Sequence, residues 1–249
     1  MSVPQTFGRY IEPFVGSACL FFAIEPADAI LGDFNVALME TYRTIAVSPD
    51  EVLGAALEIP DNERAYYRLR EVHPETLEPI PRAARFVYLN RHCFNGVYRT
   101  NLKGQFNVPR GRDTGTLPSM QDFKNCAILL QRASLRAGDF EYVLEETRPG
   151  DFVYLDPPYA KADERYSGEY GYGAFSSEDF GRLLCQLERI NNLGAIFLLS
   201  YRYGLAVHRQ LRKWNTSVVS VRRHVAGFSG ARGDVRELLV SNRQIVKAH

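Results

Sequence analysis

The first fifty residues alternate short apolar runs with a stretch of helical spacing. Residues 10–12 have the composition of a short strand, which Pro13 ends. An apolar stretch follows over residues 18–24, and a second strand-like run over residues 29–31 leads into a helical pattern at residues 35–45. This order of strand, helix, strand and helix is typical of an open α/β sheet with acidic residues at its strand ends.

The same alternation returns after residue 121. Apolar side chains from Phe180 to Ile190 keep helical spacing, and Ser176 with Asp179 is expected to cap that helix. Four further apolar runs predict buried strands, the last two as a pair: residues 152–155, 195–200, 218–221 and 237–240. The sequence therefore predicts an α/β core that a different segment interrupts.

That segment has its own composition. Residues 51–81 are polar and predict helices, whereas residues 82–112 are rich in Arg, Asn and Gly. Two short aromatic runs, at residues 86–89 and 106–108, flank a turn-prone stretch. We interpret residues 101–104 as the tip of a hairpin, which can be presented to a duplex groove.

Composition narrows the class of protein. The 249-residue chain has an ordinary hydrophobic content of 45%, enough for a real core. Its longest apolar runs are far shorter than a membrane span, and its start does not resemble a signal peptide. The four cysteines lack the spacing of a metal site or a disulfide framework: Cys19, Cys93, Cys126 and Cys185. We therefore expect a soluble, cytoplasmic protein without a metal.

The formal net charge of +1 conceals a separation of charge along the chain. Residues 1–81 contain five basic and thirteen acidic side chains, whereas residues 82–112 contain seven basic and no acidic ones. A surface that faces phosphates requires such uncompensated cations, because charge neutralisation dominates affinity for nucleic acids. The alternative is a solvated face that lacks acids.

The sharpest chemical signal is the run from Asp156 to Tyr159 (Asp-Pro-Pro-Tyr), directly after the predicted strand at residues 152–155. Open α/β sheets bind ligands at the carboxyl ends of their strands. The two prolines stiffen the loop and leave carbonyl acceptors, so the run offers a carboxylate, a carbonyl and an aromatic face. The exocyclic amine of a nucleobase needs this set. A rigid turn with a packed tyrosine is the alternative.

Two weaker signals lie at the ends of the first two predicted strands. The turn from Glu12 to Gly16 (Glu-Pro-Phe-Val-Gly) lets the backbone approach a nucleotide-like ligand, although such turns are common. Asp33, with Asn35 after it, can accept hydrogen bonds from ribose hydroxyls. A helix cap is an equally good explanation of these two residues.

Three sequence blocks occur in one order: Tyr-Ile-Glu-Pro-Phe-Val-Gly at residues 10–16, Asn-Arg-His-Cys-Phe-Asn-Gly at residues 90–96 with its continuation to Pro109, and Asp-Pro-Pro-Tyr at residues 156–159. In this order they resemble the Dam-type DNA adenine-N6 methyltransferases. The resemblance extends from Tyr10 to Asn242. A weaker match is Gly-Asp-Phe at residues 138–140, which resembles the family's adenine-binding strand end.

The resemblance implies a Rossmann-like S-adenosylmethionine-dependent methyltransferase fold with a mixed sheet and an inserted DNA-recognition domain. Residues 1–50 and 113–249 would form the catalytic domain, and residues 51–112 the helical and hairpin insert that recognises the target. Nine residues would bind the cofactor S-adenosylmethionine: Glu12, Pro13, Phe14, Gly16, Asp33, Asn35, Asp139, Phe140 and Asp156.

The implied reaction is methyl transfer to N6 of an adenine in duplex DNA, with no metal. The adenine is expected to flip out of the stack, because its amine is unreachable within the duplex. Asp156 and the carbonyl of Pro157 would accept hydrogen bonds from N6, Pro158 would stiffen the loop, and Tyr159 would stack on the extruded ring. Positioning and electrostatics would supply most of the acceleration.

Base recognition would come from the basic insert, in which seven residues are expected to contact DNA: Arg91, Asn95, Val97, Arg99, Asn101, Lys103 and Pro109. Arg99 is expected to make a bidentate contact with a guanine, whereas Lys103 and Arg91 touch phosphate or brace the fold. The likeness of this block to members that methylate GATC makes GATC the expected site. The alternative for each asparagine is that it only ties the hairpin together.

The chain departs from the family near its start. Members usually carry a lysine before the first block, where it helps to hold the cofactor's carboxylate, and the nine residues before Tyr10 contain none. Arg9 is the candidate substitute, although it lies very close to the strand. Ser17 and Ala18 stand where the family often has further glycines. These changes bear on cofactor affinity rather than on the fold.

Three hypotheses for the function remain. The first is an active DNA adenine methyltransferase with double-stranded DNA as its partner, no membrane, and a protein partner from a defence or modification system as a further candidate. The second is a DNA-binding relative that no longer methylates and serves as a recognition subunit. The third is methylation of another planar amine, in RNA or in a glutamine side chain, which the basic hairpin and Asp156 disfavour.

Overall fold

The computed structural model describes residues 3–96, 98–101, 104–112, 114–159, 175–222 and 234–244. The described chain divides into two compact units. The first contains the described residues up to 34 and from 138 onward, and the second contains the described residues from 35 to 137. The functional division expected at residues 51 and 113 stays a prediction, because compactness does not assign a role to either part.

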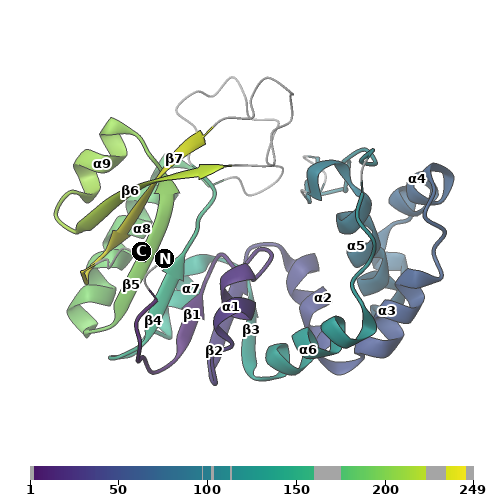
Figure 1. Ribbon diagram of the computed structural model, residues 1–249, viewed down its shortest axis with the longest axis horizontal. Coiled ribbons are helices and arrows are strands. Elements are labelled where there is room, and N and C mark those ends of the chain that lie inside the picture. The colour runs from purple at the N-terminus through teal and green to yellow at the C-terminus, as the bar shows by residue number, and fades with distance from the viewer. Residues whose placement is uncertain are drawn as a thin grey trace. The chain divides into compact units, whose positions relative to one another are not determined.

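The sheet has seven strands in the spatial order β3-β2-β1-β4-β5-β7-β6. Their bounds are β1 (Tyr10–Glu12), β2 (Ala29–Asp33), β3 (Ala133–Ala137), β4 (Phe152–Leu155), β5 (Ile196–Arg202), β6 (Asn215–Arg222) and β7 (Asp234–Ser241). β2, β1, β4 and β5 are parallel neighbours, whereas β7 runs antiparallel between β5 and β6. The predicted α/β fold with a mixed sheet is therefore confirmed (Figure 1).

The central strands end where the sequence predicts. β1 stops before Pro13, which lacks the N–H that a sheet ladder needs, and β4 stops before the Asp156–Tyr159 loop with its two prolines. All three residues of β1 are buried, as expected for a parallel strand that is covered on both faces. The loops at these two strand ends are thus held by the best-packed part of the sheet.

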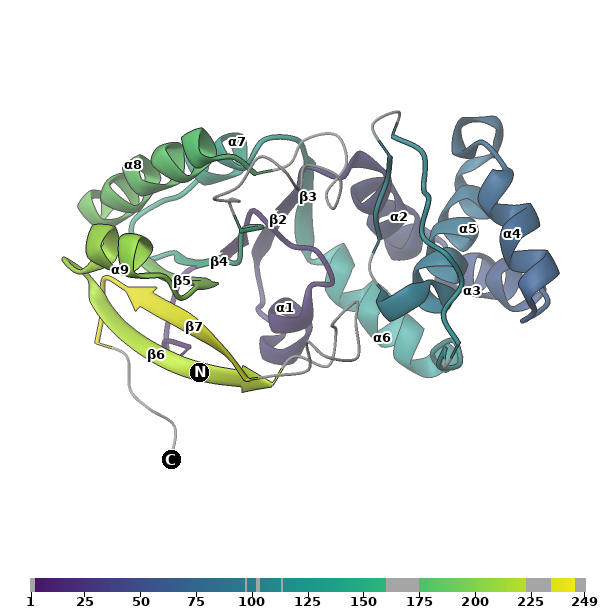
Figure 2. The same ribbon diagram turned by 90° about the horizontal axis from the view of Figure 1, so that it is seen from above.

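The described residues of the first unit form four helices: α1 (Cys19–Ile24), α7 (Phe140–Glu145), α8 (Ser177–Leu193) and α9 (Leu205–Leu211). α8 begins with the predicted cap, in which Ser176 and Asp179 each bond the backbone N–H of the other, and it ends at Gly194 with φ +79°. α7 packs against β1 and β2, and α8 against β5. Both lie on one face of the sheet, and α1 lies on the opposite face (Figure 2).

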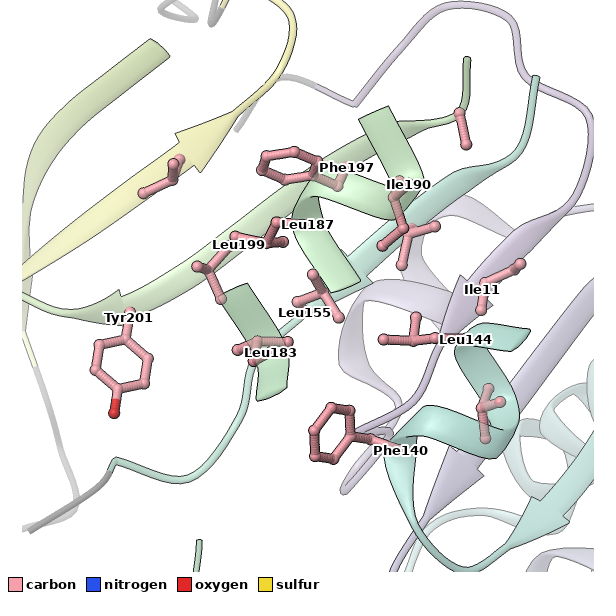
Figure 3. Packing of buried hydrophobic residues seen from close by; sticks show 14 of the residues in the cluster. Ile11, Phe140, Leu144, Leu155, Leu183, Leu187, Ile190, Phe197, Leu199 and Tyr201 are labelled. Carbon is pink, nitrogen blue, oxygen red and sulfur yellow. The ribbon is translucent and has the colours of Figure 1, made fainter. Parts of the chain in front are cut away.

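The core of the first unit lies between this helical layer and the sheet. Leu183, Leu187 and Ile190 of α8 are buried against apolar side chains of the central strands, among them Phe197 and Leu199 of β5 (Figure 3). Each such side chain contributes roughly 1.5–3 kcal/mol when it is fully buried. The packing holds β1 and β4 in place, and with them the loops that follow these strands.

The second unit is mainly helical, as predicted for residues 51–81. Its described helices are α2 (Val36–Val47), α3 (Pro49–Leu57), α4 (Glu63–Glu71), α5 (Pro79–His92) and α6 (Met120–Gln131), with short 3-10 turns at Pro74–Thr76 and Phe94–Gly96. α5 packs against α2 and α3, and β3 contacts α2 and α6.

The predicted hairpin is present, with one correction. Thr100 and Phe106 form an antiparallel bridge, and the Gly104 N–H donates to the Asn101 carbonyl at 2.9 Å. The aromatic run at residues 86–89, however, lies within α5 and is no part of the hairpin. The buried side chains there include positions 85, 88, 89 and 92, which is the i, i+3, i+4, i+7 spacing of a helix face, so this spacing outweighs the aromatic composition of the run.

No helix within the described ranges has the length and apolar character that crossing a membrane requires.

Candidate functional site

Three carboxylates lie at adjacent strand ends. Glu12 is the last residue of β1, Asp33 is the last residue of β2, and Asp156 directly follows β4. β1 lies between the other two strands and runs parallel to both, so the three carboxyl ends meet at one edge of the sheet. We call these three residues the acidic strand-end edge. In open α/β proteins ligands bind at this position.

Glu12 is the buried member of this edge. The residue is 3% exposed, and the Tyr10 hydroxyl donates a 2.8 Å hydrogen bond to its Oε2. Burial raises the pKa of Glu12 to about 8; the nearby charges of Asp156 and Asp33 add to this rise, and the hydrogen bond from Tyr10 opposes it. At neutral pH the Glu12 carboxyl is therefore mainly protonated, which reduces the repulsion among the three acids.

The turn after β1 is shaped by left-handed backbone conformations. Gly16 has φ +44°, and its N–H donates to Asp33 Oδ2 at 2.9 Å, which links the turn to the end of β2. A Cβ at Gly16 would meet nothing within 4 Å, so the space beside this backbone is open. Ala18 has φ +55° and is fully buried. It follows the backbone path that favours glycine, although it carries a side chain.

Arg9 is not placed to replace the family's lysine. It precedes β1 and so lies at the opposite end of that strand from Glu12. Its guanidinium donates to Asp151 Oδ2 and to the Glu146 carbonyl, each at 2.7 Å, and Asp151 precedes β4. The side chain therefore joins the amino ends of two strands, away from the acidic strand-end edge.

Aromatic rings gather beside the predicted adenine-binding strand end. Phe14, in the turn after β1, lies 5.2 Å from Phe140 between ring centroids, and Phe175 lies edge-on to Phe14 at 5.8 Å. Asp139 caps α7, because its Oδ1 accepts the Glu141 N–H at 2.9 Å. A carboxylate next to aromatic faces can accept from the amine of an adenine whose ring packs alongside.

Arg182 of α8 is a member of this cluster that the sequence did not predict. Its guanidinium donates to Asp139 Oδ1 at 2.7 Å, to Glu141 Oε2 at 2.5 Å and to Asp179 Oδ1 at 2.8 Å. It also lies 4.9 Å from the centre of the Phe140 ring. Hydrogen bonds to Asp139 and Glu141 raise the pKa of Arg182 further above its usual range. Only Asp179 lies one helical turn from Arg182 in the sequence. The contacts with Asp139 and Glu141 join distant parts of the chain, so helical spacing could not predict them.

The Asp156–Tyr159 loop presents its acid and holds its aromatic ring. Asp156 and Pro158 are exposed, Pro157 is buried, and Tyr159 is half-buried. The Tyr159 hydroxyl donates to Glu237 Oε1 at 3.3 Å, and its ring meets Tyr201 edge-on at 5.3 Å between centroids. Glu237 and Tyr201 come from β7 and β5, and we did not predict them as site residues. Strand pairing places them here, and pairing is invisible in local sequence.

Two further residues were predicted to bind the cofactor, Pro13 and Asn35. Pro13 is buried in the turn after β1. Asn35 belongs to the second unit, where it caps α2 by accepting the Leu38 N–H at 3.2 Å. This is the alternative stated for it above, and a contact with a ligand stays a prediction.

The described residues among the predicted DNA contacts lie in the second unit, at the end of α5 and in the loops after it. Arg91 is exposed, and its Nε donates to the Thr116 carbonyl at 2.7 Å. Asn95 is exposed with φ +59°, and Pro109 is exposed with its carbonyl accepting the Phe94 N–H at 2.8 Å. The predictions for Val97 and Lys103 fall outside the described residues.

Arg99 lies on the first arm of the hairpin, which aromatic stacking anchors to α5. Its neighbour Tyr98 lies 4.4 Å from Phe86 of α5 and 5.0 Å from Phe106 of the second arm, measured between ring centroids. Arg99 Nε is buried and has no hydrogen-bond partner within the described part of the chain. The arm that carries this arginine is thus fixed by packing, while one donor of its guanidinium is unsatisfied.

Asn101 closes the hairpin. Its Oδ1 accepts the Gln105 N–H at 3.0 Å, and its Nδ2 donates to Gln105 Oε1 at 3.1 Å. This is the tying role stated above as the alternative for the asparagines, so a contact between Asn101 and a base stays a prediction.

Among the described residues, no group of three or more His, Cys, Asp or Glu side chains is arranged to hold a metal ion. The donor set does fit S-adenosylmethionine. Carboxylates at the strand ends can accept from ribose hydroxyls and from an amine, and the open space beside Gly16 allows close approach to the backbone.

The sequence is similar to known DNA methyltransferases, which is consistent with a site that fits S-adenosylmethionine. The model of the D12 class N6 adenine-specific DNA methyltransferase family matches residues 2–225. The Type II methyltransferase M1.LlaDCHI of Lactococcus lactis subsp. cremoris is 30% identical, over 96% of this chain and 88% of its own. The Type II methyltransferase M.MjaIII of Methanocaldococcus jannaschii is 31% identical, over 94% and 88%. The DNA adenine methylase of Escherichia coli K12 is 31% identical, over 92% and 84%.

Proposed function

The chain belongs to the D12 class of N6 adenine-specific DNA methyltransferases, and from this premise we propose that it methylates a flipped adenine within one duplex sequence, GATC. The observation that carries the proposal is the acidic strand-end edge. Its member Asp156 is exposed, and the ring of Tyr159 is held in the same loop. The choice of GATC rests on the sequence of residues 90–109. The named relatives do not decide the recognition sequence, because they include Type II enzymes as well as a DNA adenine methylase.

Cofactor binding is proposed for the acidic strand-end edge and for the neighbouring rings of Phe14 and Phe140. Asp33 accepts from the ribose hydroxyls, Asp139 accepts from the amine of the cofactor's adenine, and the rings of Phe14 and Phe140 pack beside that adenine. Glu12 and Pro13 form the buried start of the turn after β1, and Gly16 leaves its backbone accessible to the cofactor. When bound, S-adenosylmethionine supplies an electrophilic methyl group.

The Asp156–Tyr159 loop is proposed to hold the target amine. The Asp156 carboxylate and the Pro157 carbonyl each accept a hydrogen bond from N6. These two bonds direct the nitrogen lone pair toward the methyl group. The Tyr159 ring stacks on the extruded base, in an orientation that Glu237 and Tyr201 maintain. With the cofactor bound, its methyl group would pass to N6 with the sulfur as leaving group, and one N6 proton would leave to solvent. The loop acts by positioning, which is where most of the acceleration arises.

DNA recognition is proposed for residues 82–112 of the second unit, which we call the basic segment. Arg99 donates to a guanine in the major groove, for which its place on a hairpin arm that is anchored by ring stacking is support. Arg91 and Lys103 contact phosphates, and Asn95, Val97, Asn101 and Pro109 lie near the bases. Because two of the named relatives are Type II methyltransferases, we also propose a role in a modification or defence system, with a protein partner, in the cytoplasm.

Methylation mapping tests the proposal. The purified chain is incubated with labelled S-adenosylmethionine and unmethylated plasmid, and modified adenines are located by sequencing. Methyl groups confined to GATC are expected. Methylation at another single motif would keep the reaction and overturn the site. Intact DNA binding without any incorporation would favour the recognition-subunit hypothesis instead.

A further inference from the structure

Two arginines of α8 hold the two ends of α7, in different ways. Arg189 donates to the backbone carbonyls of Leu144 and Glu145 at 2.8 and 3.1 Å, at the end of α7. Arg182, two turns earlier on α8, reaches side chains instead, and it does so at the start of α7. The first contact braces a helix end, whereas the second acts on a residue of the proposed cofactor site.

The contact with Asp139 fixes the direction of a carboxylate. Asp139 Oδ1 accepts from both the Glu141 N–H, at 2.9 Å, and Arg182 Nη2, at 2.7 Å. Two donors on one oxygen leave the carboxylate little freedom to rotate, so the direction of Oδ2 is set as well. Within the described residues Oδ2 makes no hydrogen bond of its own, and Asp139 stays partly exposed.

The charge of Arg182 is needed to keep this arrangement. Three carboxylates, those of Asp139, Glu141 and Asp179, converge on the one guanidinium. Without it they would repel one another, and Asp139 would turn toward solvent. The same guanidinium covers one side of the Phe140 ring, so it orders both the carboxylate and the ring next to it.

We propose that Arg182 is a positioning residue that holds Asp139 Oδ2 toward the cofactor's adenine and so makes the site select a 6-amino purine over a 6-oxo purine. The inference rests on the proposed function, in which Asp139 accepts from that amine. A 6-oxo group places an acceptor where the carboxylate requires a donor, and a fixed carboxylate cannot turn away from it. Selectivity therefore depends on how firmly Asp139 is held.

The test compares two ligands on the full chain by calorimetry: S-adenosylhomocysteine, which has the 6-amino group, and S-inosylhomocysteine, which has a 6-oxo group. The wild type is expected to prefer the adenosyl ligand. Arg182→Met is expected to lose about tenfold in affinity for the adenosyl ligand and little for the inosyl ligand, so the preference falls about tenfold. Arg182→Lys keeps the charge but not the fork, and an intermediate preference is expected.

Arg189→Met is the matched control. It removes the arginine contacts at the far end of α7, so it is expected to lower the melting temperature while the preference between the two ligands stays at the wild-type value. If Arg182→Met does not fold, Arg182→Lys carries the test. An unchanged preference in a folded Arg182 variant would overturn the inference and leave the proposed function standing. A wild type that binds both ligands equally would instead overturn the role of Asp139, and a wild type that binds neither would overturn the proposed cofactor.

Discussion

The acidic strand-end edge of the first unit and the basic segment of the second unit are built by different means. Parallel strands bring Glu12, Asp33 and Asp156 together from distant parts of the chain, and burial of the strands fixes their places. The basic residues are close in sequence and lie at a helix end and in exposed loops, with Arg99 on an arm that rings anchor. The first region thus depends on the core for its geometry, whereas the second depends on local contacts.

The difference predicts that chemistry and DNA binding separate under mutation. Asp156→Ala is expected to lower the methyl-transfer rate by at least about a hundredfold, because it removes the carboxylate that accepts from N6. DNA affinity is expected to stay within about twofold of the wild type, since no phosphate contact is lost. Single-turnover transfer and a DNA titration measure the two quantities. Wild-type turnover in this variant would refute the assigned mechanism.

Arg9, a cation of the first unit, is expected to affect stability, whereas the cations of the basic segment are expected to affect DNA binding. Arg9→Met leaves Asp151, whose side chain is 4% exposed, without its ion-pair partner. We expect a loss of about 3 kcal/mol in the free energy of unfolding, measured by urea denaturation, with the affinity of the folded protein for S-adenosylhomocysteine unchanged. A variant that unfolds like the wild type but binds the cofactor weakly would return Arg9 to the lysine's role.

Acid burial in the first unit also predicts a dependence of stability on pH. The pKa of Glu12 is raised to about 8 in the folded protein, so the folded state holds this proton after the unfolded chain has released it near pH 4.5. The stabilisation is complete below pH 4.5 and is lost as the pH rises to about 8, at an expected cost of about 5 kcal/mol. Glu12→Gln should remove this part of the slope.

Urea denaturation at several pH values, with Glu178→Gln of the exposed surface as the control, measures the effect. Parallel profiles for Glu12→Gln and the wild type would show that Glu12 does not carry a raised pKa.

The basic segment is expected to respond in sequence preference rather than in stability. Arg99→Ala should cost about 1–3 kcal/mol in binding to the target duplex and relax the preference at one base pair, because a bidentate guanine contact is lost. Arg43→Ala, which removes a guanidinium bonded to the Leu135 carbonyl, is the control within the same unit. An equal loss on all duplex sequences would make Arg99 a phosphate contact.

The same contrast explains which features the sequence predicted. β1, the α8 cap and the strand before Asp156 were predictable, because proline, glycine and capping residues mark element ends locally. The hairpin turn was predictable from its residues as well. The family match confirms the predicted enzyme class, DNA adenine-N6 methyltransferase.

The features that were missed depend on contacts between distant residues. Arg182 meets Asp139 only because α8 packs beside α7, and Glu237 meets Tyr159 only because β7 pairs with β5. The aromatic run at residues 86–89 has strand-like composition, and burial against neighbouring helices keeps it in α5. Local composition cannot report such packing.

The most direct test of the account measures both ligands on two variants. The affinities for S-adenosylhomocysteine and for a GATC duplex are determined for Asp33→Ala and for Arg99→Ala. We predict that Asp33→Ala loses about tenfold in affinity for the cofactor product and keeps its affinity for DNA, and that Arg99→Ala shows the reverse. Variants that each lose both affinities to the same extent would contradict the assignment of cofactor binding to the acidic strand-end edge and of DNA recognition to the basic segment.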